Sequence, residues 1–275
     1  MGRQGRFDMN KKLILFGLLI IFCVLSCSKG NNVEKHDDSL FVLSGAGLKV
    51  VLDPLAEEFT KKTGIKVKYS YLCSAMLLTN IQLTRQGDVF VPGSRYYFNL
   101  ARKKGLVDER YVADAVYQVP CIMVQKGNPK NIKCLEDLLK PGMKLGIGDS
   151  EATAVGRITE VMLKRLGYFD KFMKNVVLIQ GTATKLALSV CMNSVDAAIN
   201  WLPTAKPFSH CSDIVLIDKE KVMYSTAPIA LCIYSKKKEQ AKKYFDFVLS
   251  PEGRRIFAEH GYGLYFEPKP DQYLE

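Results

Sequence analysis

The sequence predicts an α/β protein built of two similar lobes, each a mixed, mostly parallel sheet flanked by helices, with a cleft between them. Three observations support this. A short apolar run, a turn of small residues and an amphipathic helix follow one another four times. Strands and helices alternate along most of the chain, which is typical of a parallel sheet covered on both faces. The second half repeats the order of the first.

The N-terminal segment predicts export from the cytoplasm. An apolar run at residues 13–25 follows Lys11 and Lys12; it is short for a bilayer-spanning helix and has the length of a signal-peptide core. The run ends in Val24-Leu25-Ser26-Cys27, which resembles the cleavage and acylation sequence of bacterial lipoproteins. We therefore expect a lipoprotein signal peptide over residues 1–26, while an uncleaved anchor and a plain secretory leader remain open.

This reading implies a protein anchored by lipid on the extracytoplasmic, periplasmic side of a bacterial membrane. Cys27 would carry the lipid, and the polar residues 27–38 would form a tether to the folded part. Met9 begins a more usual signal peptide than Met1, and the sequence leaves the choice open. Which membrane holds the anchor is also open.

The first lobe is expected to start with three strand-helix units. Gly64 should end the first helix, and Pro92-Gly93 marks a turn after the third strand. We assign residues 39–118 and 234–275 to this lobe. The expected strands are 40–43, 65–71 and 88–91, and the expected helices are 48–59, 77–83 and 96–104.

The second lobe, over residues 119–233, is expected to repeat this plan. Pro141-Gly142 should close a short helix, and Gly167 should stop a longer one. The expected strands are 119–124, 144–147, 176–179, 196–200 and 229–234, and the expected helices are 135–139, 158–166 and 186–192, with 239–249 and 251–260 returning to the first lobe.

The four turns between strands and helices carry the functional signal. They are residues 44–47, 73–75, 149–156 and 181–184. Each places free backbone N–H groups and a small residue at a helix N-terminus, where the macrodipole is positive and anions bind. In open α/β sheets, ligands bind beyond the carboxyl ends of the strands, where these turns would lie. The pattern predicts a site for a small oxyanion.

Composition argues against several other functions. The formal net charge is +11, but an exported protein is an improbable partner of nucleic acid, and the basic residues fall at helix ends and turns, as on a solvated surface. His36, His210 and His260 are scattered along the chain. Neither a directly coordinated metal, nor a catalytic triad, nor a cofactor is therefore expected.

The cysteines beyond the leader are expected to be unpaired. They form no C-x-x-C pair, and several lie in apolar runs, where a free cysteine behaves as a small buried hydrophobe. Export permits disulfides, but the sequence does not give their connectivity. These cysteines are Cys73, Cys121, Cys134, Cys191, Cys211 and Cys232.

The mature chain resembles the solute-binding proteins of molybdate-type ABC importers over nearly its whole length. The resemblance implies the two-lobed, hinge-closing fold of periplasmic binding proteins, a monomer, a permease partner and no enzymatic activity. It rests on the order and spacing of Leu43-Ser44-Gly45-Ala46-Gly47-Leu48, Gly87-Asp88-Val89-Phe90-Val91-Pro92-Gly93, Lys104-Gly105-Leu106-Val107, Lys126-Gly127-Asn128-Pro129, Gly148-Asp149 and Leu249-Ser250-Pro251-Glu252-Gly253.

The same resemblance implies a set of ligand-binding residues. Ser74 falls on a serine donor of the family, Val155 and Ala183 fall on its amide donors, and Trp201 falls on its tyrosine. Gly47 replaces a serine, so that its own N–H or the hydroxyl of Ser44 would have to substitute. Trp201 could donate through its indole N–H.

The second and third of the four turns, residues 73–75 and 149–156, also carry hydroxyl groups whose role the sequence leaves open. Thr153 is a further candidate for ligand binding from its place in the third turn. Ser74 and Thr153 could instead cap the helices that follow them.

The expected function is capture of a tetrahedral oxyanion, molybdate or tungstate, and its delivery to a membrane permease. Sulfate, phosphate or a small organic acid are alternative ligands. A sensor that reports its loaded state and an exported hydrolase using Cys73 or Ser74 as nucleophile are alternatives of other classes.

Overall fold

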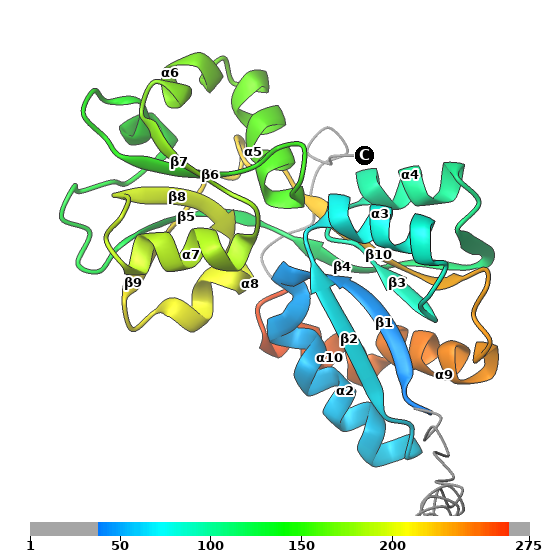
Figure 1. The fold of residues 1–275 in the computed structure, drawn as a ribbon. Coiled ribbons are helices and arrows are strands. Elements are labelled where there is room, and N and C mark those ends of the chain that lie inside the picture. Colours follow the sequence, from blue (N-terminus) through cyan, green and yellow to red (C-terminus); the bar gives the residue numbers. More distant parts are fainter. Residues whose placement is uncertain (1–37, 264–275) are drawn as a thin grey trace, which may run out of the picture. The chain divides into compact units, whose positions relative to one another are not determined.

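Two five-stranded sheets organise the part of the chain that the computed structural model describes, residues 38–263 (Figure 1). The first sheet has the order β2-β1-β3-β10-β4 and the second β7-β6-β8-β5-β9. The first comprises β1 (Leu40–Gly45), β2 (Val67–Leu72), β3 (Val89–Val91), β4 (Val107–Gln118) and β10 (Ser225–Cys232). The second comprises β5 (Pro120–Gln125), β6 (Leu145–Gly148), β7 (Val176–Gln180), β8 (Ala197–Trp201) and β9 (Ser212–Leu216).

The expected signal peptide, the expected lipidation site Cys27 and all but the last residue of the expected tether lie outside the described residues, as do residues 264–275. Within residues 38–263, no helix is long and apolar enough to cross a membrane.

Helices cover both faces of the first sheet. One face packs against α2 (Lys49–Thr63), α9 (Lys238–Leu249) and α10 (Pro251–Glu259), with Phe59, Tyr244 and Phe257 in that core. The other face packs against α3 (Ser74–Thr84) and α4 (Arg95–Lys103) through Leu77 and Phe98. As predicted, Gly64 ends α2, in a left-handed conformation with φ 73° that a residue without a Cβ adopts freely.

The second sheet is covered in the same way. One face packs against α5 (Ala154–Arg165), α6 (Phe169–Met173) and the 3₁₀ helix η2 (Leu135–Leu139). The opposite face packs against α7 (Ala183–Cys191) and α8 (Leu202–Ala205). Two further 3₁₀ turns, η1 (Ala46–Leu48) and η3 (Lys206–Phe208), precede α2 and follow α8.

Both sheets are mixed, as predicted. In the first, β1 is parallel to β2 and β3, and β10 is antiparallel to β3 and β4. In the second, β6 is parallel to β7 and β8, and β5 is antiparallel to β8 and β9. The chain passes between the sheets from β4 to β5 and from β9 to β10, and these four strands pair antiparallel with their neighbours. Parallel pairings therefore do not predominate, although the sequence predicts mostly parallel sheets.

One expected boundary is wrong. The range 119–233 places β10 in the second lobe, whereas β10 pairs with β3 and β4 of the first sheet. The chain returns to the first sheet after β9, between residues 217 and 224. The apolar run that forms β10 has no feature that distinguishes one buried sheet from the other, so its partners could not be identified from local pattern.

The expectation of unpaired cysteines is also wrong for two residues. Cys191, at the end of α7, forms a disulfide with Cys211, which directly precedes β9. Cys121 and Cys232 are free and fully buried, as their apolar surroundings predict, and Cys73 and Cys134 are free and partly buried. Burial raises the pKa of the Cys121 and Cys232 thiols well above the usual value.

Candidate functional site

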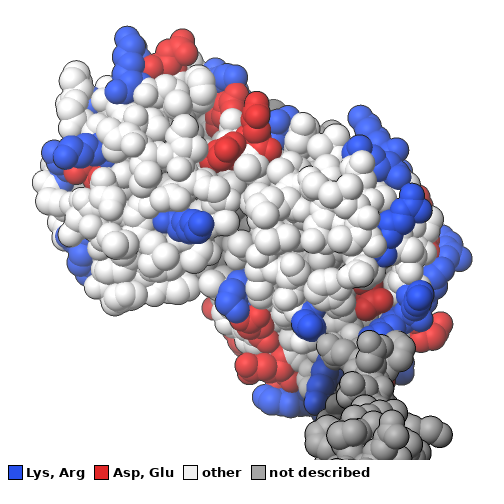
Figure 2. Space-filling model, viewed as in Figure 1, with Lys and Arg blue, Asp and Glu red and all other residues white. Residues whose placement is uncertain are grey.

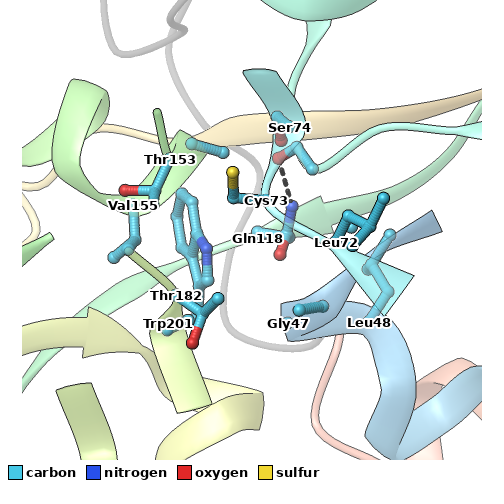
Figure 3. A pocket seen from close by; sticks show the side chains of 15 residues that line it. Gly47, Leu48, Leu72, Cys73, Ser74, Gln118, Thr153, Val155, Thr182 and Trp201 are labelled. Carbon is cyan, nitrogen blue, oxygen red and sulfur yellow. Dashed lines mark hydrogen bonds between the residues drawn. The ribbon is translucent and has the colours of Figure 1, made fainter. Parts of the chain in front are cut away.

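A small cavity lies where the four predicted turns meet, and residues from both lobes line it (Figure 3). The first lobe contributes residues 45–48, 72–74 and Gly93, and the second contributes 153–155, Thr182, Ala183 and Trp201. Its volume is about 30 Å³, at least twice the roughly 10–15 Å³ that holds one water molecule. The space therefore suits a ligand of a few atoms.

The turns converge because each follows the carboxyl end of a parallel strand. The first two follow β1 and β2, and the other two follow β6 and β7. Parallel neighbours end at the same edge of a sheet, so each lobe brings two helix N-termini to the same place. The four turns therefore meet at one cavity, as the sequence predicts.

Ser74 is the first residue of α3, and its side chain is directed at the cavity. Cys73 is the N-cap, without a side-chain capping bond, so the capping role that Ser74 could have taken is absent. Ser74 is 2% exposed, and its hydroxyl makes no hydrogen bond within residues 38–263. A buried hydroxyl without a partner is costly unless a ligand supplies one.

The threonines in the third and fourth turns do cap their helices. The Thr153 hydroxyl accepts from the Gly156 amide at 3.0 Å and donates to the Asp149 carbonyl at 2.7 Å. The Thr182 hydroxyl accepts from the Lys185 amide at 3.2 Å. Thr153 lines the cavity, but its hydroxyl proton is already donated to the Asp149 carbonyl. We therefore correct its expected role from ligand donor to helix cap.

Backbone amides at these two N-termini supply donors instead. Val155 and Ala183 occupy the first turns of α5 and α7 and line the cavity. Amides in the first turn of a helix have no partner within the helix. The structure therefore brings together the two residues that the sequence proposed as amide donors.

The first turn contributes backbone rather than a hydroxyl. Ser44 is fully buried and is absent from the cavity lining, and its hydroxyl lies 3.4 Å from the Gly45 carbonyl. The expectation that Ser44 could replace the missing serine is therefore wrong. Gly47 lines the cavity directly opposite Trp201.

Trp201, at the end of β8, presents its indole to the cavity. It is 2% exposed, and its indole N–H makes no hydrogen bond within residues 38–263. Figure 3 shows the indole nitrogen on the edge of the ring that faces Gln118 and Gly47. Trp201 is thus a second buried donor without a partner.

Sequence reasoning missed Gln118, which lines the cavity where β4 passes into β5. It is 1% exposed, and its Nε2 donates to the Gly93 carbonyl at 2.7 Å. A lone polar residue in the apolar stretch before Pro120 was the available signal. The cavity lining also includes Cys73, whose sulfur points inward in Figure 3.

The cavity is neutral. No Asp, Glu, Lys, Arg or His is among the described residues that line it. The Asp149 carboxylate, the acceptor closest in sequence, already accepts from the amides of Glu151 at 2.8 Å and Ala152 at 3.1 Å. Figure 2 shows Lys and Arg scattered over the visible face rather than gathered in one patch.

This arrangement offers hydrogen-bond donors without formal charge. Two helix N-termini from the second lobe, the start of α3, a hydroxyl and an indole N–H converge on a small, closed space. Partial positive charge at helix N-termini favours an anion. Residues 38–263 contain no cluster of three or more His, Cys, Asp or Glu that could hold a metal ion.

The sequence profile of the bacterial extracellular solute-binding proteins matches residues 40–263. The chain belongs to this family. The family comprises solute-binding proteins of importers rather than enzymes, and its members act outside the cytoplasm. The resemblance to molybdate-type binding proteins seen in the sequence is confirmed by relatives and by solved structures.

Two relatives illustrate the range of similarity. A Haemophilus influenzae protein described only as a binding protein is 29% identical over 227 residues, which cover 81% of this chain and 90% of that protein. The molybdate-binding protein of Mycobacterium bovis is 21% identical over 225 residues, covering 82% of this chain and 84% of that protein.

Solved structures share the two-lobed fold. The periplasmic molybdate-binding protein of Azotobacter vinelandii matches with a TM-score of 0.74 and 15% identity, covering 83% of this chain and all of that one. The sulfate-binding protein of Mycobacterium tuberculosis matches with a TM-score of 0.75 and 18% identity, covering 82% of this chain and 86% of that one. At these identities the likeness establishes the fold of this solute-binding protein.

Proposed function

We propose that this solute-binding protein captures a fully deprotonated tetrahedral oxyanion, molybdate or tungstate, and delivers it to the permease of an ABC importer. One observation carries the proposal: a neutral cavity at helix N-termini holds two buried donors, Ser74 and Trp201, that have no partner within the described residues. A ligand that accepts hydrogen bonds in several directions would satisfy both donors and the amides.

The donor set favours a dianion over a partly protonated one. Hydrogenphosphate carries an O–H group, and leaving that donor unpaired in a closed cavity costs roughly 1–3 kcal/mol. Asp149 is an acidic residue of the third turn, but it is not among the residues that line the cavity. Molybdate, tungstate and sulfate carry no such hydrogen.

The size and charge of the cavity argue against larger or cationic solutes. A volume of about 30 Å³ is small for a sugar or an amino acid. The lining has no carboxylate to pair with an ammonium group or a metal cation. A small anion is the ligand class that meets both restrictions.

Calorimetric titration with molybdate, tungstate, sulfate and phosphate tests the proposal. We expect molybdate and tungstate to bind at least tenfold more tightly than phosphate, since 1.4 kcal/mol corresponds to about tenfold in affinity. Elemental analysis of the purified protein by mass spectrometry should detect retained molybdenum or tungsten. Phosphate binding as tight as molybdate binding would contradict the donor argument.

Sulfate is the second candidate, because the Mycobacterium tuberculosis sulfate-binding protein has the same fold. Sulfate is also a dianion without hydrogens, so the donor set alone does not separate it from molybdate. The titration does: tighter binding of sulfate would assign the protein to sulfate import.

We further propose that Cys27 carries a lipid anchor and that the mature protein acts as a monomer at the membrane surface. The Val24-Leu25-Ser26-Cys27 sequence supports the anchor. Labelling of growing cells with radioactive palmitate should mark the wild type and not the Cys27→Ser variant. Light scattering of the soluble part should give the mass of one chain. Labelled Cys27→Ser protein would contradict the assignment.

A further inference from the structure

The two lobes touch beside the cavity through residues that do not line it. Glu151, Ala152 and Arg157, in the third turn and at the start of α5, lie against the starts of α3 and α4. Val155, an amide donor of the proposed site, belongs to the same segment. Ligand contact and lobe contact are therefore made by one short stretch of the second lobe.

Two hydrogen bonds join the lobes at this contact. The Tyr97 hydroxyl, on α4, donates to the Glu151 carbonyl at 2.5 Å. The Ala75 amide, on α3, donates to the Ala152 carbonyl at 3.2 Å. Tyr97 is only 3% exposed, so its hydroxyl is shielded from water in the closed arrangement.

A cation–π contact lies next to these bonds. The guanidinium carbon of Arg157 lies 3.5 Å from the centre of the Tyr96 ring. The Arg157 Nε is buried and has no hydrogen-bond partner within residues 38–263. The stacking on Tyr96 joins α5 of the second lobe to α4 of the first, so it exists only while the lobes are together.

We propose that Tyr97 and Arg157 are positioning residues that prolong ligand capture by holding the lobes closed without touching the ligand. The proposal rests on the proposed function, because it assumes that this cavity holds the ligand. Their contacts form across the lobe boundary, so they stabilise the closed state and not the open one. Their loss should therefore raise the dissociation rate and leave the association rate nearly unchanged.

Stopped-flow fluorescence can measure both rates without a label. The chain contains one tryptophan, Trp201, and this residue lines the cavity. Tyr97→Phe removes only the hydroxyl, and Arg157→Lys keeps the positive charge while removing the planar guanidinium. Each variant should release the anion roughly three- to tenfold faster than the wild type, the range expected from loss of one such contact.

Matched variants away from the contact serve as controls. Tyr111→Phe removes a tyrosine hydroxyl from β4, and Arg102→Lys alters an arginine that pairs with Glu109 in the same lobe. Both should retain the wild-type dissociation rate. A purely structural role for Tyr97 or Arg157 would lower the unfolding temperature of the ligand-free protein without a selective change in dissociation.

Outcomes for this contact and for the proposed function are separable. If the wild type binds phosphate better than molybdate, the proposed ligand is wrong, and the ratio of dissociation rates is measured with phosphate instead. If no tested anion binds, small-angle scattering of the ligand-free protein tests the lobe contact instead. The Tyr97→Phe, Arg157→Lys double variant should then have a larger radius of gyration than the wild type. Unchanged dissociation rates, or without a ligand an unchanged radius of gyration, overturn the proposal.

Discussion

A Cβ atom added to Gly47 would lie 3.4 Å from Cδ1 of Trp201, across the cavity from one lobe to the other. These are the two positions at which the sequence departs from the molybdate-type pattern, with glycine replacing serine and tryptophan replacing tyrosine. Gly47 and Trp201 are therefore neighbours across the lobe boundary. A Cβ atom at position 47 would be in van der Waals contact with the indole, so a larger side chain there would press against it.

The first prediction follows from this contact. Gly47→Ser should weaken oxyanion binding, because the added hydroxyl competes with the Trp201 indole for space, and overpacking of this kind costs about 1–3 kcal/mol. Combining it with Trp201→Tyr should restore much of the affinity. Calorimetry of both single variants and the double variant measures the coupling, and additive effects would show that the two positions are independent.

The second prediction separates two buried serines. Ser74→Ala should lower the affinity by about 1.5–3 kcal/mol, the value of a hydrogen bond to a charged group. Ser44→Ala should leave the affinity unchanged, because the Ser44 hydroxyl does not reach the cavity. Both side chains are buried, so the pair controls for effects on folding. Equal losses in the two variants would place the site elsewhere in the cleft.

Local signals allowed much of the site to be predicted from the sequence. A helix N-terminus depends on a few adjacent residues, so the turns that hold Ser74, Val155 and Ala183 could be identified one at a time. Strand direction then places the turn of Ser74 beside the first turn in one sheet, and the turn of Val155 beside that of Ala183 in the other. The same local reasoning could not decide whether the Thr153 hydroxyl is a cap or a ligand donor, since both roles use the same position.

Features that depend on distant contacts escaped prediction. β10 could be recognised as a strand, but its pairing with β3 joins residues that are far apart in the sequence. The Gln118 side chain gains its role from the Gly93 carbonyl, which follows a different strand. The Cys191–Cys211 disulfide likewise requires the end of α7 to lie near the start of β9.

The third prediction concerns this disulfide. Its loss in the Cys191→Ala, Cys211→Ala double variant should destabilise the protein by roughly 3 kcal/mol, as expected for cross-linking a loop of this order of length. A reducing agent should lower the unfolding temperature of the wild type and not of the double variant. Cys134→Ala is the control, because Cys134 is free. An unchanged unfolding temperature in the double variant would show that the bond does not contribute.

The fourth prediction concerns alkaline pH and the lobe contact. Burial raises the pKa of the Tyr97 hydroxyl from 10.0 to about 12, although the nearby Arg157 acts in the opposite direction. The closed state therefore favours the protonated hydroxyl, which is the form that donates to the Glu151 carbonyl. When the lobes open, water reaches the hydroxyl and its pKa falls toward the ordinary value.

The sign of the pH effect follows from this difference. A group whose pKa is higher in the closed state than in the open state stabilises the closed state fully at a pH below its open-state pKa. This stabilisation is lost as the pH rises through the closed-state pKa. The dissociation rate of the oxyanion should therefore stay constant up to about pH 9 and increase between about pH 10 and pH 12. Tyr97→Phe should remove this increase, while Tyr111→Phe should keep it. An increase that persists in Tyr97→Phe would assign the pH dependence to another group.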